Sequence, residues 1–86
     1  MEKKEIQIYN FIISQLTKNN DLPIMDDKEI MALRYLDIGQ IDSMELIRFI
    51  FDIEKKFKIK LSEKETSSDK FRYIEGLIKI ISKKIN

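Results

Sequence analysis

Apolar side chains recur at helical spacing in three segments of this chain. In the first segment they lie three or four residues apart, and this pattern predicts a helix over about residues 4–18. The helix is expected to end at Asn19, Asn20 and Asp21, because polar residues followed closely by a proline are typical of helix ends. The apolar stripe of this predicted helix consists of Ile6, Tyr9, Ile12, Ile13 and Leu16.

A second helix is predicted from Asp42 or Ser43 to about Phe57. Asp42 is a preferred N-cap residue, because its carboxylate can accept hydrogen bonds from the free amides of a first helical turn. Glu45, three residues later, can accept a hydrogen bond from the backbone of Asp42 in return. This reciprocal arrangement is a capping box, which is a strong signal for a helix start.

The third segment predicts a helix over about residues 69–84, with lysines near its end, where the helix dipole favours cations. Between the second and third segments, Ser62 and Glu65 have the spacing of another capping box and predict one short helix. The apolar side expected for the last helix consists of Phe71, Ile74, Leu77, Ile78, Ile81 and Ile85.

Residues 21–41 have a weaker pattern and are interpreted as a long connection. Asp26 or Asp27 can cap a short turn, and Gly39 lies where the backbone can need a positive φ angle. Long connections are usually functional or anchored by their own side chains. The anchors expected here are Tyr35, Leu36, Ile38 and Ile41. The complete pattern predicts an all-α fold, a small antiparallel bundle of three long helices and one short helix with a long first connection.

Composition narrows the functional classes. With 86 residues, 43% of them hydrophobic and 36% charged, residues 1–86 are predicted to form a single domain. The chain has no Cys and no His, which excludes disulfides, thiolate or imidazole metal ligands and every Ser-His or Cys-His catalytic pair. We therefore expect no enzymatic activity and no metal. No apolar run approaches the roughly 20 residues of a membrane span and no signal-peptide core is present, so a soluble cytoplasmic protein is expected.

The formal net charge of +1 conceals a segregation of charge along the chain. Residues 19–54 contain nine acidic and three basic residues, a net charge of −6, whereas the rest of the chain carries +7. This distribution predicts an acidic middle, able to steer a basic partner, and a basic C-terminal part.

The second predicted helix has two apolar stripes. At 100° per residue, one stripe faces the core, and it consists of Leu46, Phe49, Ile50, Ile53 and Phe57. Met44, Ile47 and Phe51 form a separate stripe well away from the core direction. Exposed apolar residues beside charged ones are typical of a partner-binding surface. The alternative is that Leu36, Ile38 or Ile41 of the long connection covers this stripe.

Ser43 is expected at the first position of the same helix. An Asp-Ser pair before an apolar run is most often a simple helix cap. Here, however, the serine adjoins the second apolar stripe and lies at the positive end of a helix dipole, where a bound phosphate is favoured by roughly 0.3 to 1 kcal/mol. A phosphodiester could therefore be accommodated at Ser43.

The chain resembles the acyl carrier proteins. The motif-level resemblance covers about residues 36–61, including residues 39–44 (GQIDSM) and residues 50–61 (IFDIEKKFKIKL), and the helix layout agrees over the whole chain. The resemblance implies that the Ser43 hydroxyl is esterified by 4′-phosphopantetheine, whose thiol carries an acyl group as a thioester, with Asp42 beside the attachment point. It also implies a partner-binding surface on this helix, formed by Met44, Glu45, Ile47, Arg48 and Phe51.

Two features depart from the common fatty-acid carriers. Two residues, Gln40 and Ile41, separate Gly39 from the Asp-Ser pair instead of one, and basic residues interrupt the usually acidic recognition helix. The chain is in these respects more similar to stand-alone carriers of specialised biosynthetic pathways, including the D-alanyl carriers. The expected partners are a phosphopantetheinyl transferase, a loading ligase or transferase and a downstream acceptor enzyme, and the protein is expected to be a monomer.

Three alternatives remain open. The first is a carrier of aminoacyl rather than acyl groups, which would also need a modified Ser43. The second is a helical interaction module that is never modified, with Asp42 and Ser43 as ordinary cap residues. The third is a nucleic-acid binder that uses the basic residues after the second helix. It is disfavoured because few aromatic residues lie among those lysines and because the chain has a matching acidic region, so neither nucleic-acid binding nor membrane insertion is expected. The lysines in question are Lys55, Lys56, Lys58 and Lys60.

Overall fold

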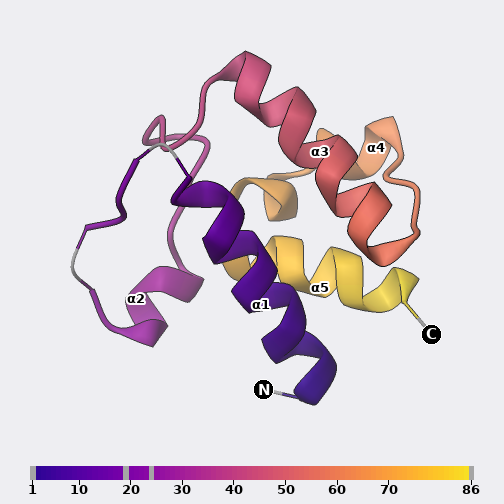
Figure 1. Cartoon of the computed structure of the whole chain (residues 1–86), viewed down its shortest axis with the longest axis horizontal. Helices are drawn as coiled ribbons and strands as arrows, with labels where there is room; N and C mark the ends of the chain where they lie inside the picture. The colour runs from indigo at the N-terminus through magenta and orange to yellow at the C-terminus, as the bar shows by residue number, and fades with distance from the viewer. Residues whose placement is uncertain (1, 19, 24, 86) are drawn as a thin grey trace.

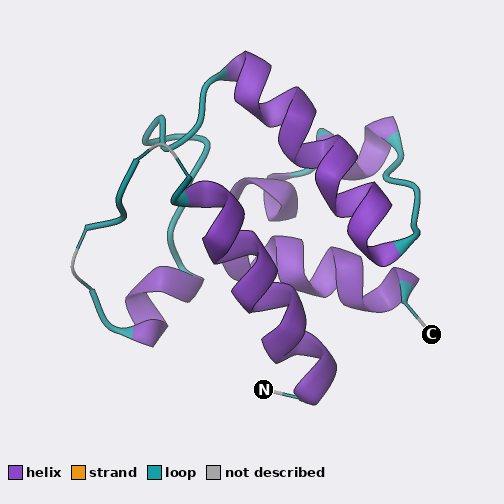
Figure 2. Cartoon of the chain, viewed as in Figure 1, coloured by secondary structure: helices purple, strands orange, loops and turns teal. Residues whose placement is uncertain are grey.

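The computed structural model describes residues 2–18, 20–23 and 25–85, and the expected helix end at Asn19 lies outside this range. The helices are α1 (Lys3–Leu16), α2 (Asp27–Met31), α3 (Ser43–Phe57), α4 (Glu63–Thr66) and α5 (Ile74–Lys84), with a 3₁₀ helix, η1 (Asp69–Arg72), before α5 (Figure 1). No strand occurs among the described residues (Figure 2). The prediction of a small all-α bundle is confirmed.

The core lies between α1, α3 and α5. It contains three residues of α1, two of α3, the aromatic ring of η1 and one side of α5. These buried residues are Ile8, Ile12, Leu16, Phe49, Ile53, Phe71, Ile74, Leu77, Ile78 and Ile81, together with Tyr35 and Ile41 of the long connection.

The prediction of which residues form the apolar stripe of α1 is partly wrong. Ile6 is 43% exposed, and Ile8, which was not expected in the stripe, is completely buried. Two residues correspond to about 200° around a helix, so one helix face cannot bury both Ile6 and Ile8. The face that α1 turns to the core is the one that Ile8 shares with Ile12 and Leu16.

The last predicted helix, over residues 69–84, is divided in the structure. Tyr73 has an extended backbone (φ −130°, ψ 155°) that separates η1 from α5. Gly76 permits the two pieces to pack closely, because a Cβ atom at this position would overlap the backbone carbonyl of Lys70. The break brings η1 back over the start of α5, and both Phe71 and Ile74 become buried.

The long connection contains α2 and is anchored to the core. Asp26 accepts a hydrogen bond from the Glu29 amide at 2.8 Å, so the cap expected at Asp26 or Asp27 is confirmed at Asp26. The hydroxyl of Tyr35 donates to the carbonyl of Phe71, and burial raises the pKa of Tyr35 well above its ordinary value. The prediction that Ile38 anchors the connection is wrong, because Ile38 is 54% exposed. Tyr35 and Ile41 fill the space beneath the loop, so Ile38 remains outside.

An exposed ionic cluster joins the connection to η1. Arg34 pairs with Asp37 and, at 2.6 Å, with Asp69, while Arg72 pairs with Asp37. The hydrogen bonds from Arg34 lower the pKa of both carboxyls, and Arg72 lowers that of Asp37 further. These contacts reinforce the attachment of the loop to the C-terminal third of the chain.

A hydrogen bond links the start of α1 to the residue after α5. The ammonium group of Lys4 donates to the carbonyl of Ile85 at 3.3 Å. In Figure 1 the described chain begins at the lower edge of the view and ends at its lower right, whereas α3 begins at the upper edge. The start of α3 is therefore remote from the chain ends.

Candidate functional site

Ser43 is the first residue of α3, and its side chain is exposed. The expected capping box is present: the Glu45 amide donates to the Asp42 carboxylate at 2.8 Å, and the Asp42 amide donates to the Glu45 carboxylate at 2.9 Å. Within the described part of the chain, the Ser43 hydroxyl makes no hydrogen bond. Asp42 and Glu45 thus cap the start of α3, and the Ser43 hydroxyl is not needed for this capping.

The backbone before Ser43 is held by a buried glutamine. Gln40 is only 6% exposed, and its Nε2 atom donates to the carbonyls of Leu16 at 3.0 Å and Asn20 at 2.8 Å. Asn20 donates in return to the Gln40 carbonyl at 3.2 Å. Gly39, immediately before, has the positive φ angle expected for it (73°). These hydrogen bonds attach the backbone segment before α3 to the end of α1 and to the loop that follows α1.

Sequence reasoning did not assign this role to Gln40. The only signal available was its position, between a glycine and the start of a helix in a segment otherwise anchored by apolar residues. Burial of an amide side chain is favourable only when its donors find partners. One partner is the Leu16 carbonyl at the end of α1, which helix geometry leaves without an intrahelical donor, and the other is the Asn20 carbonyl in the loop that follows.

The second apolar stripe of α3 is exposed. Met44 is 80% exposed, Ile47 58% and Phe51 64%. The long connection does not cover them, because Ile41 is buried in the core, Leu36 packs against the core and Ile38 is itself exposed. The stripe is therefore a solvent-facing apolar surface that begins one residue after Ser43.

The opposite side of α3 packs as expected. Phe49 and Ile53 are buried, and Leu46, Ile50 and Phe57 pack against the core from its edge. The Phe49 ring meets Tyr35 edge-on at 5.8 Å, and the Phe57 ring meets Phe11 of α1 edge-on at 5.4 Å between centroids. These contacts orient the helix, so the exposed stripe has a defined direction.

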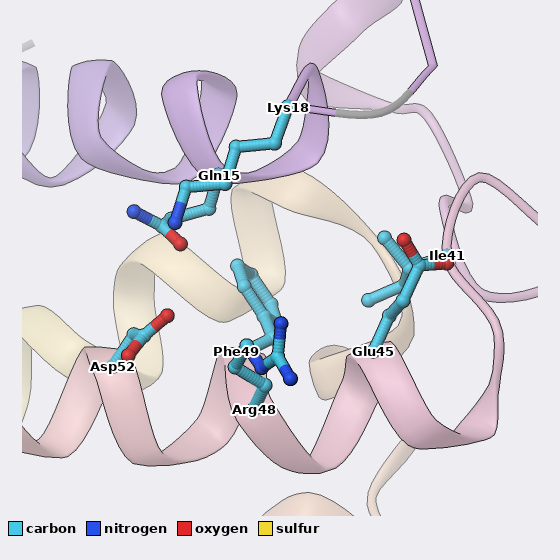
Figure 3. A pocket seen from close by; sticks show the side chains of 7 residues that line it. All are labelled: Gln15, Lys18, Ile41, Glu45, Arg48, Phe49 and Asp52. Carbon is cyan, nitrogen blue, oxygen red and sulfur yellow. The ribbon is translucent and has the colours of Figure 1, made fainter.

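A small cleft of about 130 Å³ lies between α1 and α3, near the start of α3. Figure 3 shows side chains of α1 and α3 reaching into it from both sides. Its charged residues have both signs, so their charges balance. The lining residues are Gln15, Lys18, Ile41, Glu45, Arg48, Phe49 and Asp52.

The predicted partner-binding residues occupy two different places. Met44, Ile47, Arg48 and Phe51 are exposed on α3, although Arg48 also borders the cleft. Glu45 is half-buried, lines the cleft facing α1 and holds the Asp42 amide. Its carboxylate therefore has a structural role in addition to the role expected from the resemblance.

The described residues contain no group of three or more acidic, Cys or His side chains placed to hold a metal ion. Over the same residues, none of the helices has the length and apolar character needed to cross a membrane. No protein-family model, curated protein or solved structure matches the chain.

Proposed function

We propose that this protein is a carrier that bears an acyl group as a thioester on a 4′-phosphopantetheine arm attached to Ser43. The observation that supports this proposal best is the state of the Ser43 side chain: it is exposed and free of hydrogen bonds within the described chain, at the head of a helix capped by its neighbours. The sequence around it resembles the attachment motif of acyl carrier proteins.

Attachment of the arm is a group transfer catalysed by a phosphopantetheinyl transferase, with coenzyme A as the donor. The Ser43 oxygen forms a bond to the phosphorus next to the pantetheine, and the pyrophosphate bond to the nucleotide breaks. The nucleotide bisphosphate leaves, and the hydroxyl proton passes to a base of the transferase. The arm supplies a thiol, which this chain lacks, and α3 supplies a rigid anchor whose N-terminal dipole favours the phosphodiester.

The carrier serves a dedicated biosynthetic pathway, where a ligase or transferase loads it and an acceptor enzyme unloads it. Met44, Ile47 and Phe51 form the surface on which these enzymes dock, since an exposed apolar stripe with a fixed direction is suited to transient protein contacts. An aminoacyl group in place of the acyl group would use the same serine and the same surface.

The test is the intact mass of the purified protein after incubation with coenzyme A and a phosphopantetheinyl transferase of broad specificity. The wild-type protein is expected to gain the mass of one phosphopantetheinyl group. Ser43→Ala should gain nothing, whereas the control Ser67→Ala, which alters another exposed serine, should gain the same mass as the wild type.

The interaction module that is never modified predicts no gain in any variant. Absence of a gain in the wild-type protein, or a gain that persists in Ser43→Ala, would eliminate the carrier proposal. Folding of each variant is checked by its circular dichroism and thermal unfolding.

A further inference from the structure

The acidic residues of α3 and its N-cap accept hydrogen bonds from backbone amides or line a cleft. Asp42 and Glu45 form the capping box, and Glu54 accepts a hydrogen bond from the Leu61 amide at 2.8 Å. Asp52 is half-buried and lines the cleft toward α1. Glu45, Asp52 and Glu54 are half-buried, whereas Asp42, at the N-cap, is exposed.

The basic residues of α3 have the opposite placement. Arg48 and Lys55 are exposed, and neither forms an ion pair with any residue in the described parts of the chain. Lys55 also borders the wider groove between α1 and α3, together with Lys18 and Lys56. Lys56 is engaged with the Phe11 ring, at 6.0 Å from its centroid.

Arg48 and Lys55 lie beside the apolar stripe. At 100° per residue, both are within about 60° of Phe51 around α3, on its side toward the groove. They are seven residues apart, which corresponds to about two helical turns, so they border the stripe along its length. The outward surface of α3 thus combines three apolar side chains with two cations that form no ion pair among the described residues.

We infer that Met44, Ile47 and Phe51, bordered by Arg48 and Lys55, dock a partner protein whose surface has an apolar pocket with carboxylates along one rim. This inference rests on the proposed function, and it specifies the chemistry of the partner. It reverses the expectation from the sequence that an acidic surface here would steer a basic partner. The reason is that Arg48 and Lys55 are exposed beside the stripe and form no ion pair within the described residues, whereas the acidic residues inside α3 are half-buried.

The apolar residues supply the contact area, and the cations set the selectivity. Charges at the rim of an interface act mainly on the association rate and on discrimination between partners, and they are screened by salt. The choice of an acidic partner should accordingly be strong at low ionic strength and weaken as salt is added.

The experiment titrates the isotopically labelled protein with two synthetic amphipathic helical peptides and follows its amide resonances. The peptides share one leucine-rich face and differ only in the residues that flank it, glutamates in one peptide and lysines in the other. The glutamate peptide is expected to bind about tenfold more tightly at low salt, a ratio that corresponds to two rim ion pairs of moderate strength. The largest shifts are expected at Met44, Ile47, Arg48, Phe51 and Lys55.

Two variants assign the preference to these cations. Arg48→Glu/Lys55→Glu should reverse the preference, and Arg48→Gln/Lys55→Gln should abolish it. The control Lys79→Glu/Lys83→Glu changes the net charge as much as the first variant, on exposed positions of α5, and should keep the wild-type preference. Equal binding of the two peptides, absence of binding to both, or a preference for the lysine peptide would overturn the inference.

A lipid surface is the competing occupant, because apolar and basic residues together also suit anionic membranes. Sedimentation with phosphatidylglycerol vesicles, compared with phosphatidylcholine vesicles, tests it. Binding to the anionic vesicles that is lost in Arg48→Glu/Lys55→Glu, with no preference between the peptides, would replace the protein partner by a membrane. Ser43→Ala should keep the peptide preference, so failure of the carrier proposal and failure of this inference give different results.

Discussion

The helices α3 and α5 are both amphipathic, but they use their apolar residues differently. In α5, Ile74, Leu77, Ile78 and Ile81 are all buried among 11 residues. In α3, which has 15 residues, three large apolar side chains are exposed and only Phe49 and Ile53 are buried. Core packing therefore accounts for most of the apolar sequence of α5, whereas the outer stripe of α3 has no role in the core of the described chain.

The largest expected effect separates the two sides of α3. Ile53→Ala should lower the free energy of unfolding by about 2 to 5 kcal/mol, because it leaves a cavity at a completely buried site. Ile47→Ala makes the same chemical change on the exposed stripe and should alter stability by about 0.5 kcal/mol or less. Urea unfolding followed by circular dichroism measures both values.

A comparable loss of stability in both variants would contradict the assignment of Ile47 to a free surface. It would mean that another part of the chain covers the stripe in solution.

The next effect concerns α5 and its contact with η1. Gly76→Ala should lower the free energy of unfolding by about 1 to 3 kcal/mol, because the added methyl group meets the Lys70 backbone, which cannot move without displacing η1. Lys79→Ala, at an exposed position one turn later, should remain within about 0.5 kcal/mol of the wild type. Thermal unfolding of the two variants gives the comparison, and a neutral Gly76→Ala would show that η1 does not pack as closely as described.

The smallest effect is a dependence of stability on acid, which arises from carboxylates that lie outside both helices. The pKa values of Asp37 and Asp69 are lowered in the folded state by Arg34, and that of Glu65 is lowered first by the Ser62 amide and then by Lys84. A lowered folded-state pKa contributes stability above the unfolded-state pKa, and this contribution is lost as the pH falls through the folded-state value. Stability should thus decline below the ordinary carboxyl pKa of about 4.

Urea unfolding at a series of pH values measures this decline. Asp37→Asn should make it shallower, and Asp21→Asn, at an exposed aspartate outside the ionic cluster, controls for the loss of one negative charge. An unchanged slope in Asp37→Asn would exclude the cluster as the source of the acid sensitivity.

The sequence was sufficient to predict α3 and its two apolar faces because the signals there are local. The capping box of Asp42 and Glu45 defines the start of the helix, and the 100° periodicity separates the buried from the exposed stripe. The exposure of Ser43 agrees with what a modified serine requires, but its modification stays a prediction.

The features that could not be predicted depend on contacts distant in the sequence. The choice of Ile8 over Ile6 is decided by the direction from which α5 approaches α1, and the break at Tyr73 by the packing of η1 over Gly76. Gln40 is a similar case, since the carbonyls that accept its hydrogen bonds belong to Leu16 and Asn20, which precede α2 in the chain. The local sequence pattern contains no information about how elements that are distant in the sequence pack against one another.

The pairing of Lys4 with the carbonyl of Ile85 has a practical consequence for work with this protein. Because the start of α1 and the end of α5, which this hydrogen bond links, both lie away from the start of α3 (Figure 1), a purification tag, a fluorescent label or a linker to a solid support can be joined at either of them without crowding Ser43. An immobilised form would present Ser43 and the apolar stripe to enzymes in solution, so the modification proposed for Ser43 could be followed on a sensor surface.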